Sequence, residues 1–393
     1  MSEAFVLSAV RTAIGDYGGR LKEEPPTRLA AAVVREAVSR AGVPAEQVGH
    51  VVFGNVIHTD PIDMYLARVA ALQGGLTEHT PALTVNRLCG SGLQAVLSAS
   101  EYVMQGHADV AIGGGAESMS RSLFASASVR WGQRMGEAKL FDMMLGALTD
   151  PFGHGHMGIT GENVAKKFGI GREAQDEFAL ESHRRAAHAT AEGRFREQIL
   201  PLSVKAGREH VEFAQDEHVR GDVKLADLSK LRAAFMRDGG TVTAGNASAI
   251  NDGAAAVTIA SEAYVNRSGA TPLGRLVAYA HAAVDPAVMG IGPVPAVRAA
   301  LARAGITVDQ LDVIESNEAF ASQACAVTRE LHLDPARVNP NGGAIALGHP
   351  IGATGAILVT KLLYELKRTG GRYGLVTMCI GGGQGIAAIF SRL

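Results

Sequence analysis

The sequence predicts an α/β protein with two similarly wound halves and a polar segment inserted between them. The first observation is an internal repeat, in which residues 35–52 match residues 298–315 at a constant offset. In both copies a helical stretch ends at a glycine, Gly42 or Gly305, and an apolar strand pattern follows. The second observation is that strand and helix patterns alternate through both halves, which is typical of helices covering mixed sheets.

Two further short sequence matches between the halves occur in the same order in both. Val85–Asn86 corresponds to Val338–Asn339, and the IGGG sequence at 112–115 corresponds to IGGG at 380–383. Each half therefore reads as helix, strand, loop, buried strand, helix, strand and glycine turn. A duplicated fold explains this order economically.

The third observation is that residues 118–250 hold a disproportionate share of the charged residues. This segment contains expected helices, including residues 172–193, with acidic and basic residues at i,i+4 spacing. A polar, loop-rich segment on a rigid core is a natural place for a binding cover. We expect four parts, namely an N-terminal core half (1–117), a loop domain (118–250), a return to the first half (251–270) and a C-terminal core half (271–393).

Composition restricts the classes of partner. The chain of 393 residues is 47% hydrophobic and has a net charge of −2, without a block of Lys or Arg. Neither nucleic acid nor an anionic membrane surface is indicated, and no apolar run reaches the roughly 18 residues that a membrane span needs. Three cysteines and an N-terminus without a leader pattern indicate a reducing compartment, the cytoplasm. The final Ser-Arg-Leu resembles a peroxisomal address, although so short a match arises easily by chance.

Cys89 lies between an apolar strand pattern and a helical pattern, within residues 85–96. At the N-terminus of a helix, free backbone N–H groups and the helix dipole favour an anion, so we expect a lowered thiol pKa. Gly90 and Gly92 allow another group to approach closely. Taken alone, Cys89 is better explained as a core cysteine in a tight turn, and only a partner base elsewhere in the chain favours a catalytic role.

The C-terminal half supplies three candidate partners. Asn317 follows a predicted strand, and His349 lies in a glycine-rich loop before a helix, at the position that Cys89 occupies in the first half. Cys379 ends another buried strand, beside the glycines that begin at Gly381. Such strand ends are where α/β proteins assemble their sites.

Other motif matches carry little weight. GHGHMG at 153–158 fits G-x-G-x-x-G, but no strand precedes it and no βαβ unit frames it, so dinucleotide binding is improbable. His154 and His156 lack a further ligand at metal-site spacing, so no metal is expected. The sequence contains neither G-x-S-x-G nor a Walker A motif.

Four segments together resemble the thiolase family: VNRLCGSGLQA, NEAFA, GGAIALGHPIGATGA and CIGGGQG. The likeness covers essentially the whole chain and is strongest to bacterial acetyl-CoA acetyltransferases and β-ketothiolases. It implies a duplicated five-layer αβαβα core with an inserted loop domain, and a homotetramer built as a dimer of dimers. It also implies coenzyme A and its thioesters as substrates, with no permanently bound cofactor.

The resemblance implies a role for each candidate catalytic residue. Cys89 matches the acylated nucleophile, activated by His349, and Cys379 matches the thiol that moves the α-proton, a task suited to a thiol near its operating pKa. Two oxyanion sites are implied. One consists of His349 with a water held by Asn317, and the other of the backbone N–H groups of Cys89 and Gly381.

The resemblance also implies the contacts with coenzyme A, namely His156, Met157, Arg220, Phe235, Ala244, Ser248 and Phe320. Asp227 departs from the family pattern, since many members carry Ser there, and Ala249 stands where Gly is common. A carboxylate near a phosphorylated ligand is unfavourable unless it pairs with Arg220 or Lys230, so Asp227 is not assigned to the site.

Two alternatives to a thiolase stay open. A ketoacyl-synthase relative would share the fold and the Cys nucleophile but place His or Asn at position 379. A non-catalytic acyl-CoA binding protein would be expected to lack at least one of the four chemical residues. The sequence leaves the direction of the reaction and the acyl chain length open, because condensation and thiolysis use the same groups.

Overall fold

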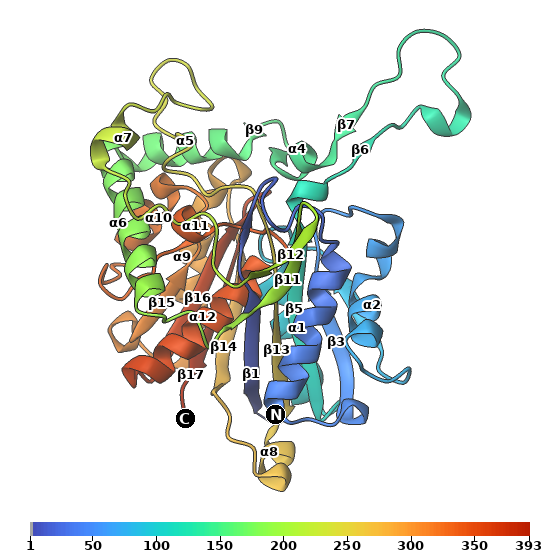
Figure 1. Ribbon diagram of the computed structural model, residues 1–393. Helices are drawn as coiled ribbons and strands as arrows, with labels where there is room; N and C mark the ends of the chain where they lie inside the picture. Colours follow the sequence, from blue (N-terminus) through green and yellow to red (C-terminus); the bar gives the residue numbers. More distant parts are fainter. Residues whose placement is uncertain (1–2) are drawn as a thin grey trace.

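The computed structural model describes residues 3–393 and shows two halves with the same strand order (Figure 1). The first half contains, in spatial order, β1 (Ala4–Thr12), β13 (Asn251–Ser261), β5 (Val110–Ser118), β3 (Val48–Gly54) and β4 (Ala82–Val85). The second contains, in the corresponding order, β14 (Gly274–Ala283), β17 (Gln384–Ser391), β16 (Tyr373–Ile380) and β15 (Val313–Ser316).

The strand pairings repeat as well. In each half two antiparallel pairings are followed by a parallel pairing. The next pairing in the first half, β3 with β4, is parallel, and its counterpart is a single parallel bridge between Ile314 and Val338. The predicted duplication is thereby confirmed in the topology. The match of Val85 to Val338 is not exact in register, because Val338 lies beside Ile314, the counterpart of Val51, whereas Val85 lies beside Gly54.

The two sheets meet edge to edge. β1 and β14 pair antiparallel at Phe5 with Arg275 and at Val6 with Gly274, so a continuous 11-stranded sheet results. Two short strands, β2 (Gly15–Asp16) and β10 (Ile199–Leu200), add to β13 and β1. The halves are therefore joined through backbone hydrogen bonds as well as through side-chain packing.

The helices form the remaining layers of the αβαβα core. α3 (Ser91–Met104) and α12 (Thr354–Thr369) pack against each other and against both sheets, which makes them the central layer. Their close approach needs glycine, since a Cβ on Gly355 would lie 2.1 Å from the Leu93 nitrogen. α1 (Pro26–Ala41) and α2 (Leu66–Gln73) cover the first sheet, and α9 (Pro293–Ala304) covers the second.

Residues 119–250 connect β5 to β13 and lie over one end of the core (Figure 1). The larger helices of this segment are α5 (Met157–Phe168) and α6 (Arg172–Ala191), and its short elements are β6 (Phe124–Ala125), β7 (Phe141–Asp142), α4 (Met143–Ala147), β8 (Thr149–Asp150), β9 (Gly155–His156), β11 (Leu202–Ala206), β12 (Glu209–Phe213) and α7 (Leu225–Ser229). The hairpin of β6 and β7 projects away from the body. The four-part division into domains stays a prediction.

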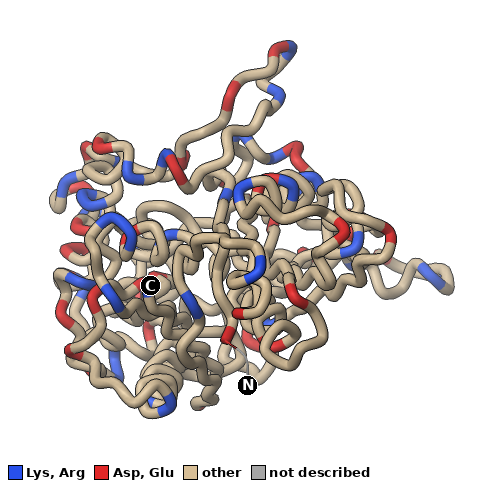
Figure 2. The backbone as a smooth tube through the Cα atoms, turned by 90° about the horizontal axis from the view of Figure 1, so that it is seen from below, with Lys and Arg blue, Asp and Glu red and all other residues tan. Residues whose placement is uncertain are grey.

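Three further helices complete the chain, namely α8 (Glu262–Ser268), α10 (Ala321–Glu330) and α11 (Ala344–Leu347). In the view of Figure 2, basic and acidic residues are interspersed around the periphery rather than separated onto faces of one sign. Within residues 3–393, every helix is too short or too polar to cross a membrane.

Candidate active site

A tight turn presents Cys89 just ahead of α3. Leu88 has a positive φ of 45°, an uncommon conformation for a residue with a side chain. Hydrogen bonds fix it, because Ser91 Oγ accepts the Arg87 N–H at 2.8 Å and donates to the Leu88 carbonyl at 2.7 Å. Asn86 Oδ1 accepts the Leu88 N–H at 2.9 Å. α3 then begins at Ser91, so the predicted placement of Cys89 before a helix is correct.

The turn lies directly against the end of β16. A Cβ on Gly90 would come within 2.6 Å of Ile380 Cδ1, which explains the glycine after Cys89. Backbone N–H groups of Gly381 and of Cys89 itself are directed at the Cys89 sulfur. The two N–H groups predicted to form one oxyanion site therefore converge on the sulfur.

Cys89 does not have the lowered pKa that its helix position predicts. Burial raises the pKa of the thiol to about 11, and the nearby Glu117 carboxylate adds to this increase, while the two N–H groups oppose it. The expectation is wrong because desolvation of a thiolate inside the protein outweighs the helix dipole. In the ligand-free protein Cys89 is consequently a thiol that needs a base.

His349 is buried and neutral. Its Nδ1 lies 2.6 Å from Thr354 Oγ1, and that hydroxyl donates its own hydrogen to the Pro350 carbonyl at 2.9 Å. Nδ1 must therefore carry the imidazole hydrogen, which leaves the lone pair on Nε2. Burial lowers the pKa of His349 to about 4. Nε2 is 3.4 Å from Asn317 Nδ2, so the structure brings these two predicted residues together.

Two buried side chains from the first half hold the loop that carries His349. Asn251 Oδ1 accepts the His349 N–H at 2.8 Å, and Glu117 Oε2 accepts the Gly352 N–H at 2.8 Å. Glu117 also accepts the N–H group of Ile57. Burial raises the pKa of Glu117 to about 8 despite these donors. The loop of His349 is thus held by side chains from the adjacent strands β5 and β13.

Cys379 and Asn317 lie behind the surface that a ligand would contact. Cys379 is 1% exposed and packs in a cluster with Met157, Met289 and Phe320. Burial, with a contribution from Cys89, raises its pKa well above the ordinary range, so the expectation of a thiol near its operating pKa is wrong for the ligand-free protein. Asn317 is also 1% exposed, and its Oδ1 lacks a hydrogen-bond partner within residues 3–393.

A cavity of about 590 Å³ opens onto Cys89, His349 and Gly381. Small-molecule sites commonly have this size. Its wall includes all seven residues predicted to contact coenzyme A, which are His156, Met157, Arg220, Phe235, Ala244, Ser248 and Phe320. Their assignment as ligand contacts stays a prediction, but the structure does gather them around one cavity.

The family models for the thiolase N-terminal domain and the thiolase C-terminal domain match residues 4–263 and 270–392. The chain belongs to the thiolase family. It is 62% identical over 391 residues to beta-ketothiolase BktB of Cupriavidus necator, covering 100% of this chain and 99% of that protein. An acetyl-CoA acetyltransferase of the same organism is 47% identical, with full coverage of both chains.

Solved thiolase structures have the same fold. The crystal structure of human mitochondrial 3-ketoacyl-CoA thiolase superimposes with a TM-score of 0.98 at 44% identity, covering 100% of this chain and 99% of that chain. The same human enzyme in complex with CoA gives a TM-score of 0.96. These matches confirm the predicted thiolase fold.

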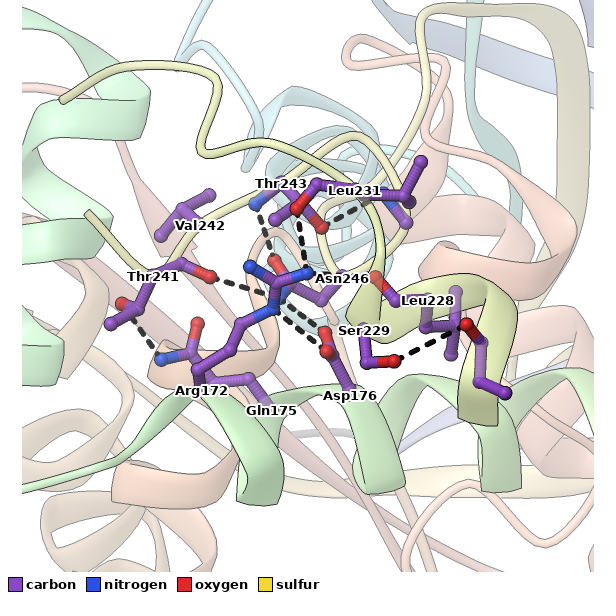
Figure 3. A network of polar contacts seen from close by, with 12 residues as sticks. Arg172, Gln175, Asp176, Leu228, Ser229, Leu231, Thr241, Val242, Thr243 and Asn246 are labelled. Carbon is purple, nitrogen blue, oxygen red and sulfur yellow. Dashed lines mark hydrogen bonds and ion pairs between the residues drawn. The ribbon is translucent and has the colours of Figure 1, made fainter. Parts of the chain in front are cut away.

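In this thiolase a polar network holds the loop that supplies part of the cavity wall (Figure 3). Arg172 on α6 donates to the carbonyls of Leu228 and Leu231 at 2.7 and 2.9 Å and pairs with Asp176 at 2.7 Å. Asp176 in turn accepts from Asn246 Nδ2 at 2.9 Å. The network therefore anchors residues 228–246, which include the cavity residues Phe235 and Ala244.

Sequence reasoning missed several residues of the site. Asp16 and His218 line the cavity, while Glu117 and Asn251 hold the His349 loop. None belongs to a short motif that signals its role, because each partnership joins residues far apart in the chain. Asp227, by contrast, lies away from the cavity wall, which agrees with leaving it unassigned, and its carboxylate pairs with Lys230 at 4.0 Å.

The discounted motif at 153–158 has a structural explanation. His156 begins α5 by accepting the Gly158 N–H on its Nδ1 at 3.1 Å. In the part of the chain that the structure describes, no group of three His, Cys, Asp or Glu side chains could hold a metal ion.

Proposed function

We propose that this thiolase is an acyltransferase that reversibly condenses two acyl-CoA molecules to a 3-ketoacyl-CoA and free coenzyme A. The observation that carries the proposal is that Cys89 and a neutral His349 line one cavity, with Cys379 packed directly behind it. The names of its relatives, beta-ketothiolase and acetyl-CoA acetyltransferase, support acetyl-CoA as one substrate and acetyl-CoA or a short acyl-CoA as the other.

The first half-reaction is acyl transfer to Cys89. His349 Nε2 removes the thiol proton as the sulfur attacks the thioester carbonyl, so the thiolate exists only during the reaction. The N–H groups of Cys89 and Gly381 stabilise the oxyanion. When it collapses, the carbon–sulfur bond to coenzyme A breaks, and the imidazolium returns the proton to the departing sulfur. A low pKa for His349 favours this return, because the imidazolium is a strong acid.

The second half-reaction forms the carbon–carbon bond. His349 Nε2 first takes the thiol proton of Cys379, and the resulting thiolate removes an α-proton from the second acetyl-CoA. The carbanion then attacks the acyl carbon on Cys89. The bond between the acyl group and the Cys89 sulfur breaks, and that sulfur takes up the proton held by Cys379. The hydrogen that His349 Nε2 has gained and a water held by Asn317 stabilise the enolate oxygen, and His349 afterwards returns its proton to Cys379. The unpartnered Oδ1 of Asn317 supports such a water.

The two alternatives have less support. A ketoacyl-synthase relative would carry His or Asn at position 379, where this chain has Cys. A non-catalytic binding protein would not be expected to retain Cys89, His349, Asn317 and Cys379 in one buried arrangement.

We also expect a homotetramer, a dimer of dimers, in the cytoplasm. The hairpin that projects from the body carries exposed apolar side chains, with Trp131 and Met135 each 89% exposed and Phe124 64% exposed. Exposed apolar clusters of this kind are typical of protein interfaces. Light scattering should give a tetramer for the native chain and a smaller species for Trp131→Ser. The three unpaired cysteines agree with a reducing compartment.

A direct test uses acetyl-CoA without an acceptor. After rapid quenching, intact mass measurement should show one acetyl group per chain, and peptide mapping should find it on Cys89. A label on Cys379, or a chain that never becomes acetylated, would contradict the proposal. His349→Gln should fold but acquire the label far more slowly, because it lacks the base.

A further inference from the structure

One polar corner of the active-site cavity has no part in the steps described above. It is formed by Asp16 on β2 and by His218 and Arg220 in the segment after β12. His218 Nδ1 lies 2.7 Å from Asp16 Oδ1. Elsewhere the wall is largely apolar, so this corner is where a polar group of a ligand would be recognised.

Asp16 lies close to the catalytic loop. Asn251 Nδ2 donates to Asp16 Oδ1 at 3.2 Å and to the Gly15 carbonyl at 3.1 Å. The Oδ1 of the same amide accepts the His349 N–H at 2.8 Å. A single side-chain amide therefore separates Asp16 from the backbone of the catalytic base. Asp16 therefore lines the cavity close to the loop of His349, which is the region where the reacting thioester of an acyl-CoA would lie.

Asp16 is ionised, and one of its two carboxylate oxygens accepts no hydrogen bond from residues 3–393. Although burial acts in the opposite direction, the hydrogen bond from His218 and the charges of His218 and Arg220 hold the pKa of Asp16 below its usual value. Both internal partners bond to Oδ1, and no residue within 3–393 donates to Oδ2. A carboxylate oxygen only accepts hydrogen bonds and repels phosphate, so its partner must be an N–H or O–H donor.

We propose that Asp16, held in place by His218, is a substrate-binding residue that accepts a hydrogen bond from an amide N–H of the pantetheine arm. Every acyl-CoA carries such amides near its thioester, whereas its phosphates lie far from it. The proposal rests on the proposed function, since it concerns acyl-CoA in the same cavity. It gives this corner a role in binding the part of the substrate that does not react.

Two acyl donors test the proposal in the exchange of free thiol into thioester. Acetyl-CoA carries the nucleotide and acetylpantetheine lacks it, but both carry the amides. Asp16→Ala should raise KM about tenfold for both donors, as expected for one lost hydrogen bond to a charged group, with kcat within about twofold. Asp16→Asn keeps an acceptor oxygen and should stay within about threefold of the native KM.

Asp222→Asn is the matched control, because Asp222 is an exposed carboxylate two residues after Arg220, outside the cavity wall, and its loss should leave both KM values unchanged. A higher KM for acetyl-CoA alone would mean that Asp16 acts on the nucleotide and would overturn the proposal. A lower kcat at unchanged KM would assign Asp16 to positioning His349 through Asn251, which also overturns it. Absence of exchange in the native chain would instead refute the proposed function.

Discussion

Arg172→Ala should weaken binding of coenzyme A although Arg172 lies outside the cavity wall. The guanidinium ties α6 to the carbonyls of Leu228 and Leu231 (Figure 3). A hydrogen bond from a charged group contributes about 1.5–3 kcal/mol when buried. The Arg172 side chain is 26% exposed, so water replaces part of each bond and about 2 kcal/mol for both is a fair total.

If residues 228–246 must be ordered before coenzyme A binds, this loss appears in KM. A cost of about 2 kcal/mol corresponds to an increase of roughly tenfold to thirtyfold in KM, with kcat changed less than about twofold. Initial-rate kinetics of thiolysis with varied coenzyme A measure both constants. Arg184→Ala is the matched control, because Arg184 lies on the same helix and, within residues 3–393, its side chain pairs with Glu181 alone, at the surface. An unchanged KM in Arg172→Ala, or an equal increase in the control, would refute the reasoning.

Three more predictions concern single residues. Iodoacetamide should alkylate Cys89 first, because Cys89 alone of the three cysteines lines the active-site cavity. The pKa of Cys89, about 11, is also lower than the pKa of Cys325, about 12, and lower than that of the more deeply buried Cys379. Peptide mapping that found Cys325 modified first would contradict this prediction. The pKa of His349 is about 4 in the folded protein and roughly 6.5 in the unfolded chain. Between these two values the unfolded chain binds more protons, so the free energy of unfolding decreases as pH falls from about 6.5 to about 4. Melting temperatures of His349→Gln should accordingly fall less than those of the native chain across that interval, and parallel curves would count against the buried neutral imidazole. Arg220→Ala should raise KM for acetyl-CoA more than it lowers kcat, and a fall in kcat at constant KM would remove Arg220 from the coenzyme A contacts.

Local patterns in the sequence were sufficient to predict the duplicated fold and the neighbourhood of the site. The helix after Cys89 and the strand before Cys379 have clear periodicity, and both elements occur as expected. The seven residues that the motif resemblance implied as coenzyme A contacts all line the cavity. These features could be predicted because periodicity and short motifs are properties of contiguous residues.

The protonation states could not be predicted in the same way. The helix dipole favours a low pKa for Cys89, but the pKa is set mainly by burial, which depends on the packing of both halves. The anchoring of the His349 loop was also inaccessible. Asn251 is 98 residues from His349 in the sequence, and Glu117 is 235 residues from its partner Gly352, so no local pattern links them. The functional roles assigned to individual residues stay predictions.

The most direct test of the central claim separates the two reactive cysteines. Cys379→Ala should still exchange labelled coenzyme A into acetyl-CoA, because this half-reaction needs only Cys89 and its base, but condensation and thiolysis should nearly vanish. Cys89→Ala should lose both activities, because no acyl-enzyme forms. Condensation that persists in Cys379→Ala, or exchange lost equally in both variants, would contradict the division of roles between Cys89 and Cys379.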